Sequence, residues 1–214
     1  MSKNVTLQGV KTQGINDKTA GNAQFNVNCN GVVEIKDCEF GQDGYNCVEI
    51  GLKKGYAPKH VIVENCDFTG VLGNNAISVY GWQDGANIII RNCNFGKVSN
   101  ALRFSNKLDT TCNVILENIT VEEWVDNEYA GLILMQDYTS LTEEEAIEKN
   151  LFGEGKMNIS FKNVRYPNGD LIAPEYEGQI CVGGDMPQVL YVYRNKGGMV
   201  SYDESVYPTM TFQA

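Results

Sequence analysis

The sequence predicts an all-β fold, a right-handed parallel β-helix of about six coils. Two observations support this prediction. A motif of alternating apolar and polar residues recurs along the chain with a nearly constant period, and a further short apolar strand follows each copy. The copies are centred on Gly9, Asp37, Asn65, Asn92, Asn118 and Asn163. Successive centres lie 26 to 28 residues apart, except that 45 residues separate the last two.

Each copy of the motif is predicted to form two short strands that meet at the central residue. The positions four and two residues before the centre are apolar in every copy, for example Val5 and Leu7 in the first. Three copies place a cysteine one residue after the centre and a phenylalanine two residues later: Cys38 with Phe40, Cys66 with Phe68, and Cys93 with Phe95. Because alternate residues of a strand point to the same face, these side chains are expected to stack in rows inside the helix.

A third strand completes each coil. Short apolar runs follow the six motifs at residues 25–28, 48–51, 77–81, 102–105, 132–135 and 180–184. Three strands in one repeat form a full turn of chain, and parallel strands in successive turns lie about 4.8 Å apart. Residues 1–184 are therefore assigned to the β-helix.

Two segments depart from the repeat. Residues 139–151, in the long interval between the last two motifs, contain Ser140 and Glu143 in a capping-box pattern, which predicts a short helical insertion in a connecting loop. The repeat stops at residue 185. Residues 185–214 are rich in aromatic side chains and carry a Gly-Gly pair between two apolar runs. We expect them to form a hairpin or arm that caps the last coil or binds a neighbouring subunit.

The turn residues resemble a known feature of one superfamily. Asp37, Asn65, Asn92, Asn118 and Asn163 would stack at one bend, which is similar to the asparagine ladder of the pectate-lyase-like right-handed β-helices. The resemblance covers about residues 3–184. It implies a structural role for the ladder, because stacked side-chain amides hydrogen-bond one another along the axis. It does not imply one activity, since that superfamily includes lyases, hydrolases, tailspikes, adhesins and structural virion proteins.

Two groups of side chains are candidates for an interaction surface. Ile62, Ile89 and Ile115 occupy one outward position in successive coils, so we expect an apolar stripe on the outside. Such a patch marks a contact site, which a partner subunit or the chain's own tail would cover. A simple preference of isoleucine for strands is the alternative. The second group lies in the tail and consists of Tyr191, Tyr193, Tyr202, Tyr207 and Phe212.

No catalytic residue, cofactor site or metal site is predicted. The outward positions of the third strands include Glu49, Ser78 and Arg103, and no two adjacent coils carry carboxylates there, as calcium binding or retaining glycoside hydrolysis would need. Loop acids that could converge with Arg103 are the alternative, namely Asp43, Asp84, Asp109 and Asp126. The seven cysteines contain no C-x-x-C pair, which favours free thiols over a disulfide framework or a zinc site.

Composition argues against two classes of partner. Seventeen Lys and Arg residues against 27 Asp and Glu residues give a formal net charge of −10, which repels phosphate backbones, so no nucleic acid partner is expected. Nowhere do about eighteen apolar residues run together, so no membrane partner is expected either. The first residues lack the charged and apolar regions of an export signal, and folding in the cytoplasm of a bacterial host is expected.

These features favour a non-enzymatic structural protein. By analogy with β-helical proteins of bacteriophages, we expect an accessory or decoration protein of the minor capsid or head-fibre type, located in the virion. Its partners would be other virion proteins, either capsid or tail subunits, and other copies of itself. One alternative is a tailspike-like or tail-fibre-like module that stacks a surface glycan beside Tyr56, Tyr80 and Trp82. The other is a polysaccharide lyase or glycoside hydrolase.

Overall fold

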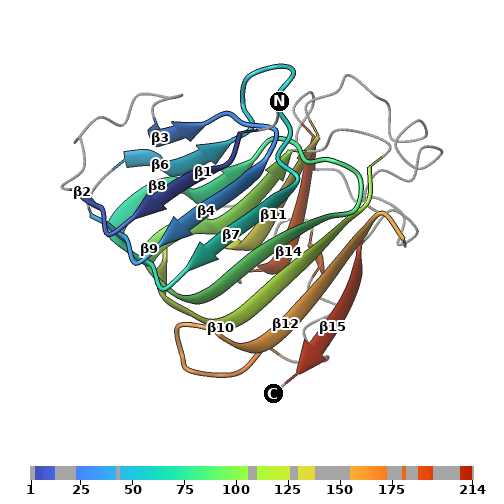
Figure 1. The fold of residues 1–214 in the computed structure, drawn as a ribbon. Coiled ribbons are helices and arrows are strands. Elements are labelled where there is room, and N and C mark those ends of the chain that lie inside the picture. The colour runs from blue at the N-terminus through green and yellow to red at the C-terminus, as the bar shows by residue number, and fades with distance from the viewer. Residues whose placement is uncertain are drawn as a thin grey trace.

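The protein forms a parallel β-solenoid, in which one chain winds repeatedly past itself (Figure 1). The computed structural model describes residues 3–12, 23–41, 44–105, 110–125, 130–137, 155–172, 180–181, 188–194 and 208–213. Within these residues every pairing between two strands is parallel, and no helix is present. The predicted class, an all-β parallel β-helix, is confirmed.

Seven strands form the first side of the solenoid. In spatial order they are β1 (Val5–Gln8), β4 (Val32–Lys36), β7 (His60–Glu64), the first part of β9 (Ala86–Ser105), the first part of β10 (Cys112–Trp124), β12 (Met157–Arg165) and β15 (Thr209–Gln213). Their register aligns two apolar rows. One row runs from Val5 to Met210, and the other runs from Leu7 to Phe212. Between the two end strands the side chains of these rows are at most 1% exposed, so the predicted rows do fill the interior.

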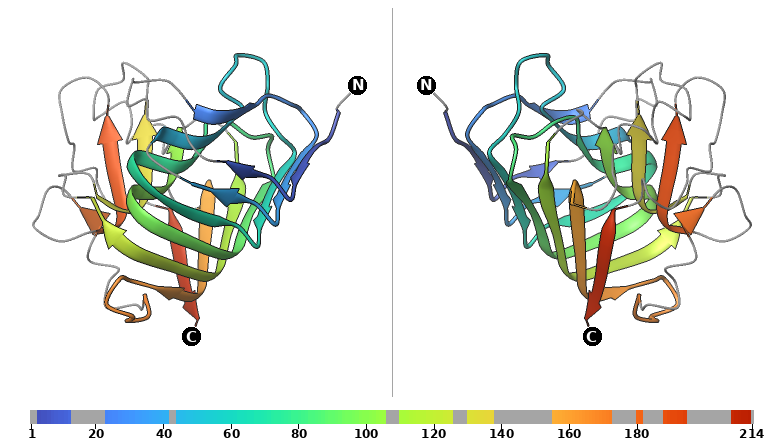
Figure 2. Two further views of the ribbon diagram at one scale, coloured as in Figure 1. Left: turned by 90° about the vertical axis from the view of Figure 1, so that its left-hand side faces the viewer. Right: turned by 90° about the vertical axis from the view of Figure 1, so that its right-hand side faces the viewer.

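The remaining strands form the other sides of the coil. β2 (Lys11–Thr12), β5 (Glu39–Phe40) and β8 (Asp67–Val79) follow the first bend, and β3 (Ala23–Val27), β6 (Gly44–Ile50), β11 (Gly131–Asp137), β13 (Ile180–Cys181) and β14 (Gln188–Arg194) belong to the third side. β8, β9 and β10 run through bends without a break, so one strand lines more than one side. Figure 2 shows the stacked coils, with the two termini at opposite ends of the stack.

The regular stack contains about 4 turns, fewer than the six predicted. At the N-terminal end, the described second side of the first coil consists of the two residues of β2. At the C-terminal end, the predicted third strand of the sixth coil, β13, does not stack on β11. Instead β14 lies between these strands and pairs with both. The first motif supplies a strand to each side, whereas the last motif supplies β12 to the first side without completing a regular coil.

The Gly-Gly pair and the second apolar run of the predicted hairpin lie outside the described residues. β14 pairs with β11 and β13, and β15 pairs with β12, so the two strands join different sides of the solenoid. The reason is the alternation of apolar residues in β15, which matches the interior rows and lets this strand bind as a further rung. The predicted helix at 139–151 lies outside the described residues.

Aromatic rings stack along the axis inside the solenoid. The ring centroids of Phe40 and Phe68 lie 4.9 Å apart, and those of Phe68 and Phe95 are also 4.9 Å apart. The rings of each pair are nearly parallel, with interplanar angles of 15° and 11°. This spacing equals the separation of neighbouring parallel strands, so each of these three coils adds one ring to the stack.

The bend after the first side has the same backbone conformation in every coil. Asp37 and the four aligned asparagines have φ values from 49° to 55°, and Gly9 has a φ of 64°. Only glycine, asparagine and aspartate adopt this left-handed region readily, which explains the residue types at the motif centres. The thiol after the bend satisfies a carbonyl group before it, as Cys66 Sγ does for Glu64 O at 3.2 Å.

Substitution of Asn92 separates the two roles of the motif centre. Asn92→Ala should lower the free energy of unfolding by about 2 to 3 kcal/mol, because alanine is strained in the left-handed region and two amide hydrogen bonds are lost. Asn92→Gly loses the same bonds without the strain, so its loss should be about 1 kcal/mol smaller. Urea unfolding followed by circular dichroism measures both values. Equal losses would show that the left-handed backbone is not costly here.

Candidate functional site

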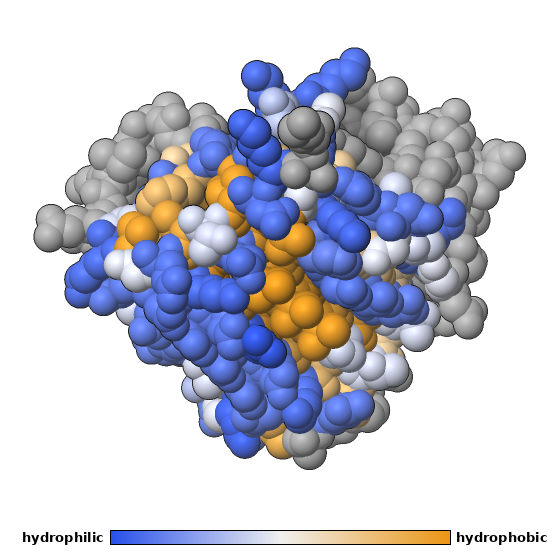
Figure 3. Space-filling model, viewed as in Figure 1, coloured by the Kyte–Doolittle hydropathy of each residue, from blue (hydrophilic) through white to orange (hydrophobic). Residues whose placement is uncertain are grey.

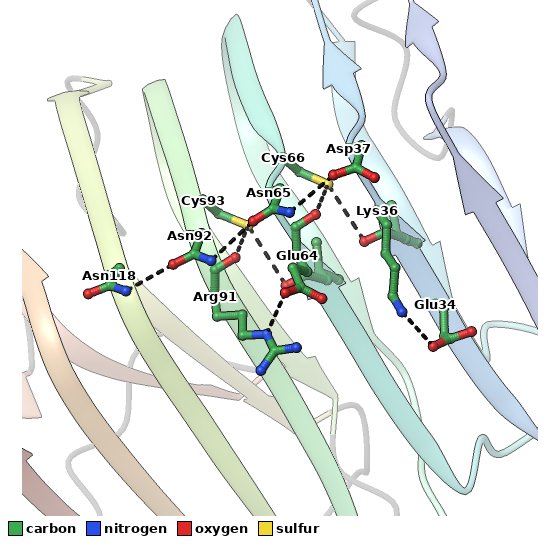
Figure 4. Close-up of polar contacts among 12 residues, drawn as sticks. Glu34, Lys36, Asp37, Glu64, Asn65, Cys66, Arg91, Asn92, Cys93 and Asn118 are labelled. Atoms are coloured by element: carbon green, nitrogen blue, oxygen red, sulfur yellow. Dashed lines mark hydrogen bonds and ion pairs between the residues drawn. The ribbon is translucent and has the colours of Figure 1, made fainter.

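The asparagine ladder runs along the outside of the first bend (Figure 4). Each amide donates a hydrogen bond from Nδ2 to the side-chain oxygen of the preceding coil: Asn65 to Asp37 at 3.1 Å, Asn92 to Asn65 at 3.1 Å, Asn118 to Asn92 at 2.9 Å, and Asn163 to Asn118 at 2.9 Å. All of these side chains are exposed except that of Asn163, which is half-buried. The ladder therefore joins five successive coils at the surface of the molecule.

The ladder has a direction, and the side chains at its two ends suit that direction. Asp37 accepts hydrogen bonds from Asn65 and, at 3.0 Å, from Gln8 Nε2, and a carboxylate can accept both because it has no donor to satisfy. The bond from Asn65, and then that from Gln8, lower the pKa of Asp37 below its ordinary value. At the other end, the oxygen of Asn163 accepts a hydrogen bond from Arg165 Nε at 3.2 Å.

A second ladder, not predicted from the sequence, runs beside the first. Asn113 Nδ2 donates to Asn87 Oδ1 at 3.2 Å, and Asn158 Nδ2 donates to Asn113 Oδ1 at 3.3 Å. The row continues to His60, whose Nδ1 accepts a hydrogen bond from the backbone nitrogen of Asn87 at 3.1 Å. Each of these asparagines stands five residues before a motif centre, so the signal was present in the sequence.

Ion pairs cross between coils on the outward face of the first side. The pairs are Arg91 Nε with Glu64 Oε1 at 3.0 Å and Lys162 Nζ with Glu117 Oε1 at 2.6 Å, and Lys36 instead pairs with Glu34 of its own strand at 2.8 Å. These side chains are partly exposed, so each pair stabilises the fold by at most about 1 kcal/mol. Their arrangement nevertheless favours one register between coils.

The predicted isoleucine stripe lies between the ion pairs and the second ladder. Ile62 is aligned with Ile89, and Ile89 with Ile115, in three adjacent strands. All three side chains are half-buried. Figure 3 shows an apolar band crossing this face between polar regions. The described strands of the tail do not cover the stripe, since β15 extends the first side beyond β12 and β14 belongs to the third side.

Charged and polar side chains are buried on the third side. Glu49, Ser78 and Arg103 are aligned in adjacent coils and are 2%, 1% and 4% exposed. Tyr80 links the two charges: its hydroxyl donates to Glu49 Oε1 at 3.0 Å and accepts from Arg103 Nη1 at 3.2 Å. The guanidinium also lies over the Tyr80 ring, 5.0 Å from its centroid. The row was predicted from the sequence, but its burial and its link through Tyr80 were not.

Tyr80 is not suited to proton abstraction at neutral pH. Burial raises the pKa of Tyr80 to about 12; the Arg103 charge opposes this rise and the Glu49 charge reinforces it. Tyr80 therefore keeps its proton at neutral pH and cannot act as a base there. Glu49 Oε1 already accepts a second hydrogen bond, from Asn46 Nδ2 at 2.7 Å. The arrangement is that of a hydrogen-bonded structural network.

A third, interior row of asparagines begins the third side. Asn46 Oδ1 accepts hydrogen bonds from the side-chain and backbone nitrogens of Asn75 at 3.2 Å and 3.1 Å. In the next coil, Asn100 Nδ2 donates to Gly131 O at 3.2 Å. All three asparagines are buried. Each stands two residues before an interior apolar residue of the third strand, a spacing that was not used in the prediction.

The aromatic residues predicted for the tail surface are only partly described. The ring of Phe212 stacks on that of Phe161, with centroids 4.8 Å apart and an interplanar angle of 5°, so Phe212 extends the interior row and is half-buried at the end of the stack. Tyr191 and Tyr193 lie in β14, of which only the backbone is described. Tyr202 and Tyr207 lie outside the described residues.

The loop acids do not assemble around Arg103 in the described part of the chain. Asp84 Oδ1 accepts hydrogen bonds from the backbone nitrogen and the hydroxyl of Thr111, both at 2.7 Å, and so acts as a turn residue. Asp43, Asp109 and Asp126 lie outside the described residues.

Six cysteines are buried free thiols: Cys29, Cys38, Cys47, Cys66, Cys93 and Cys112. Burial raises the pKa of both Cys47 and Cys112 to about 12, so these thiols are poor nucleophiles at neutral pH. Among the residues that the structure describes, no three His, Cys, Asp or Glu side chains are grouped so that they could hold a metal ion. In the same residues no helix has the length and apolar character needed to span a membrane.

Comparison with known proteins gives no match: no family model, no curated protein and no solved structure matches this chain. The class that the described residues define is a parallel β-solenoid with three asparagine rows and an apolar stripe on one outer face. Its function is therefore argued from these surfaces.

The free energy of unfolding at alkaline pH tests the Tyr80 network. Because the pKa of Tyr80 is raised above its ordinary value of 10.0, the folded protein holds this proton more tightly than the unfolded chain does. The resulting stabilisation is complete below about pH 10 and is lost as the pH rises toward about 12. When the pH is raised from about 8 to about 11.5, the free energy of unfolding should therefore fall less for Tyr80→Phe than for the unaltered chain. Urea unfolding at each pH measures both values. Parallel losses in both chains would contradict the assignment.

Proposed function

We propose that this protein is a non-enzymatic structural component of a larger assembly and that it binds another subunit through the isoleucine stripe. The assembly we propose, by analogy with other β-helical proteins, is a bacteriophage virion, in which the chain is an accessory or decoration protein contacting capsid or tail subunits. The observation that carries the proposal is the row of Ile62, Ile89 and Ile115 on an otherwise polar sheet face.

The surroundings of the stripe support a binding role. On one side lie the ion pairs and the ladder at the bend, and on the other lies the ladder of Asn87, Asn113 and Asn158. An apolar strip with a polar rim is the usual anatomy of a protein interface. The hydrogen bonds of both ladders hold the rim side chains in place before a partner arrives, which reduces the entropy lost on binding.

The third side supports the non-enzymatic part of the proposal. Its charged residues Glu49 and Arg103 are almost inaccessible to solvent, and the tyrosine between them retains its proton at neutral pH. A general base must reach the proton that it abstracts within hydrogen-bonding distance. Buried groups that already bind one another do not favour such chemistry.

The sugar-stacking alternative is not favoured by the aromatic residues that suggested it. Trp82 is 3% exposed, and its ring packs edge-on against Phe104 with centroids 6.1 Å apart, so it belongs to the core. Tyr80 is engaged by Arg103 and Glu49, and Tyr56 is half-buried. A sugar ring needs an open aromatic face, which Trp82 does not offer.

Replacement of the central isoleucine tests the proposal. Ile89→Glu places a charge in the middle of the stripe and should lower the number of copies per particle at least about tenfold, because an interface would then bury an unpaired carboxylate. Ser160→Glu is the matched control, since Ser160 follows Ile115 in the same row but is not apolar. Mass spectrometry of particles purified from the native source with each variant measures the copy number.

The circular dichroism spectrum and melting temperature of Ile89→Glu should match those of the unaltered chain, because residue 89 points away from the core. Two results would overturn the proposal: full incorporation of Ile89→Glu, or absence of the unaltered chain from every particle. Release of unsaturated, ultraviolet-absorbing product from a polyuronate by the purified chain would instead establish a lyase.

A further inference from the structure

In the described part of the chain, edge strands lie at both ends of the first side. Among the described residues, β1 pairs only with β4, and β15 pairs only with β12. An edge strand presents unpaired backbone N–H and C=O groups, and natural proteins usually protect such edges with charged residues, proline or a covering segment. The four residues of β1 and the five residues of β15 include no charged residue and no proline.

The interior is also incomplete at these two ends. Val5 and Leu7 in β1, and Met210 and Phe212 in β15, are half-buried, whereas the residues aligned with them in the five strands between are at most 1% exposed. These four side chains each have a neighbour on one side along the axis. The apolar surface that remains would be buried by one more parallel strand at either end.

The two edges are complementary in sequence. If the register between adjacent strands is continued, β15 of one copy lies beside β1 of a second copy, with Met210 on Val5 and Phe212 on Leu7 in the interior rows. On the outward face the same register pairs threonine with threonine and glutamine with glutamine: Thr211 with Thr6, and Gln213 with Gln8. Apolar residues meet apolar residues, and no like charges meet.

The outward side chains of β1 can accept these contacts. Gln8 uses its Nε2 to bind Asp37, and Thr6 uses its hydroxyl hydrogen to bind Glu34 at 3.3 Å. Each therefore keeps an oxygen as an acceptor for a donor from a neighbouring strand. The threonine hydroxyl and the glutamine amide of β15 are such donors. The bonds from Thr6 to Glu34 and from Gln8 to Asp37 have the same direction, from the earlier strand to the later one.

We propose that copies of this protein stack head to tail, with β15 of one copy pairing in parallel with β1 of the next, so that the first side continues across the junction. Such a contact is heterologous, since different surfaces of the two copies meet, and repetition of it produces a filament or a closed ring. The junction uses surfaces separate from the isoleucine stripe, so it can fail while the proposed binding role stands, and the reverse also holds.

Self-association should depend on protein concentration and on salt. Copies with a net charge of −10 repel one another at long range, and salt screens this repulsion, with a Debye length of about 10 Å at 0.1 M and about 3 Å at 1 M. In sedimentation or light scattering, the weight-average mass should rise above 23.7 kDa as the protein concentration increases, and it should rise further in high salt. Ile89→Glu should associate like the unaltered chain.

Two single substitutions give the decisive test. Val5→Lys should prevent pairing at β1 and leave β15 able to pair. Met210→Lys should prevent pairing at β15 and leave β1 able to pair. Each variant alone should remain at 23.7 kDa. A one-to-one mixture should form a species of twice that mass and nothing larger, because only the intact β15 end of the first variant and the intact β1 end of the second can join. Formation of this dimer also shows that both variants are folded.

A lysine at an interior position can disturb folding, so two double variants on the exposed face provide a second test. Thr6→Lys combined with Thr211→Lys places two like charges opposite each other at every junction and should weaken association about fivefold. Thr6→Lys combined with Thr211→Glu should restore it. The proposal is overturned if the unaltered chain stays monomeric in high salt, if the mixture of folded single variants does not dimerise, or if the charge pairs have no effect.

Discussion

The left-handed bend at the motif centres is the constraint on which the rest of the structure depends. It recurs at the same point of each coil, at Gly9, Asp37 and the four aligned asparagines. Because side chains alternate along a strand, this bend sets which residues face inward on both sides of it, and a shift by one residue would turn the apolar rows outward. Asparagine adopts the left-handed conformation of the bend, and its side chain donates a hydrogen bond to the motif centre of the preceding coil. One residue type therefore fixes both the conformation and the register.

Most of the fold could be predicted because its determinants are periodic. The interior rows, the phenylalanine stack and the ladder at the bend all repeat with the coil, and the structure places them as the alignment implies. The other two asparagine rows are equally periodic, at five residues before the motif centre and two residues before the third strand's interior apolar residue. They were not predicted, because an asparagine on a strand can equally be a solvated surface residue, and only the hydrogen bonds between coils distinguish the two cases.

The features that could not be predicted depend on contacts that no repeat encodes. The alternation of residues along the strand predicts that Glu49 and Arg103 point outward as surface charges. The neighbouring sequence does not indicate that they are buried or that the hydroxyl of Tyr80 lies between them. The strand pairing at the C-terminal end is of the same kind. β13 and β14 are both rich in apolar residues, and nothing in the repeat indicates that β14 pairs with β11 and that β13 pairs with β14.

The direction of the ladder has a consequence for how the chain is made. Every amide of the ladder donates to the side chain of the coil before it, so the acceptor always belongs to the part of the protein that the ribosome delivers first. Each winding that emerges finds an oxygen already in position, beginning with the carboxylate of Asp37, which needs no later partner to be satisfied. The molecule can thus be wound from its N-terminal end during translation, one turn upon another, without waiting for its last residues.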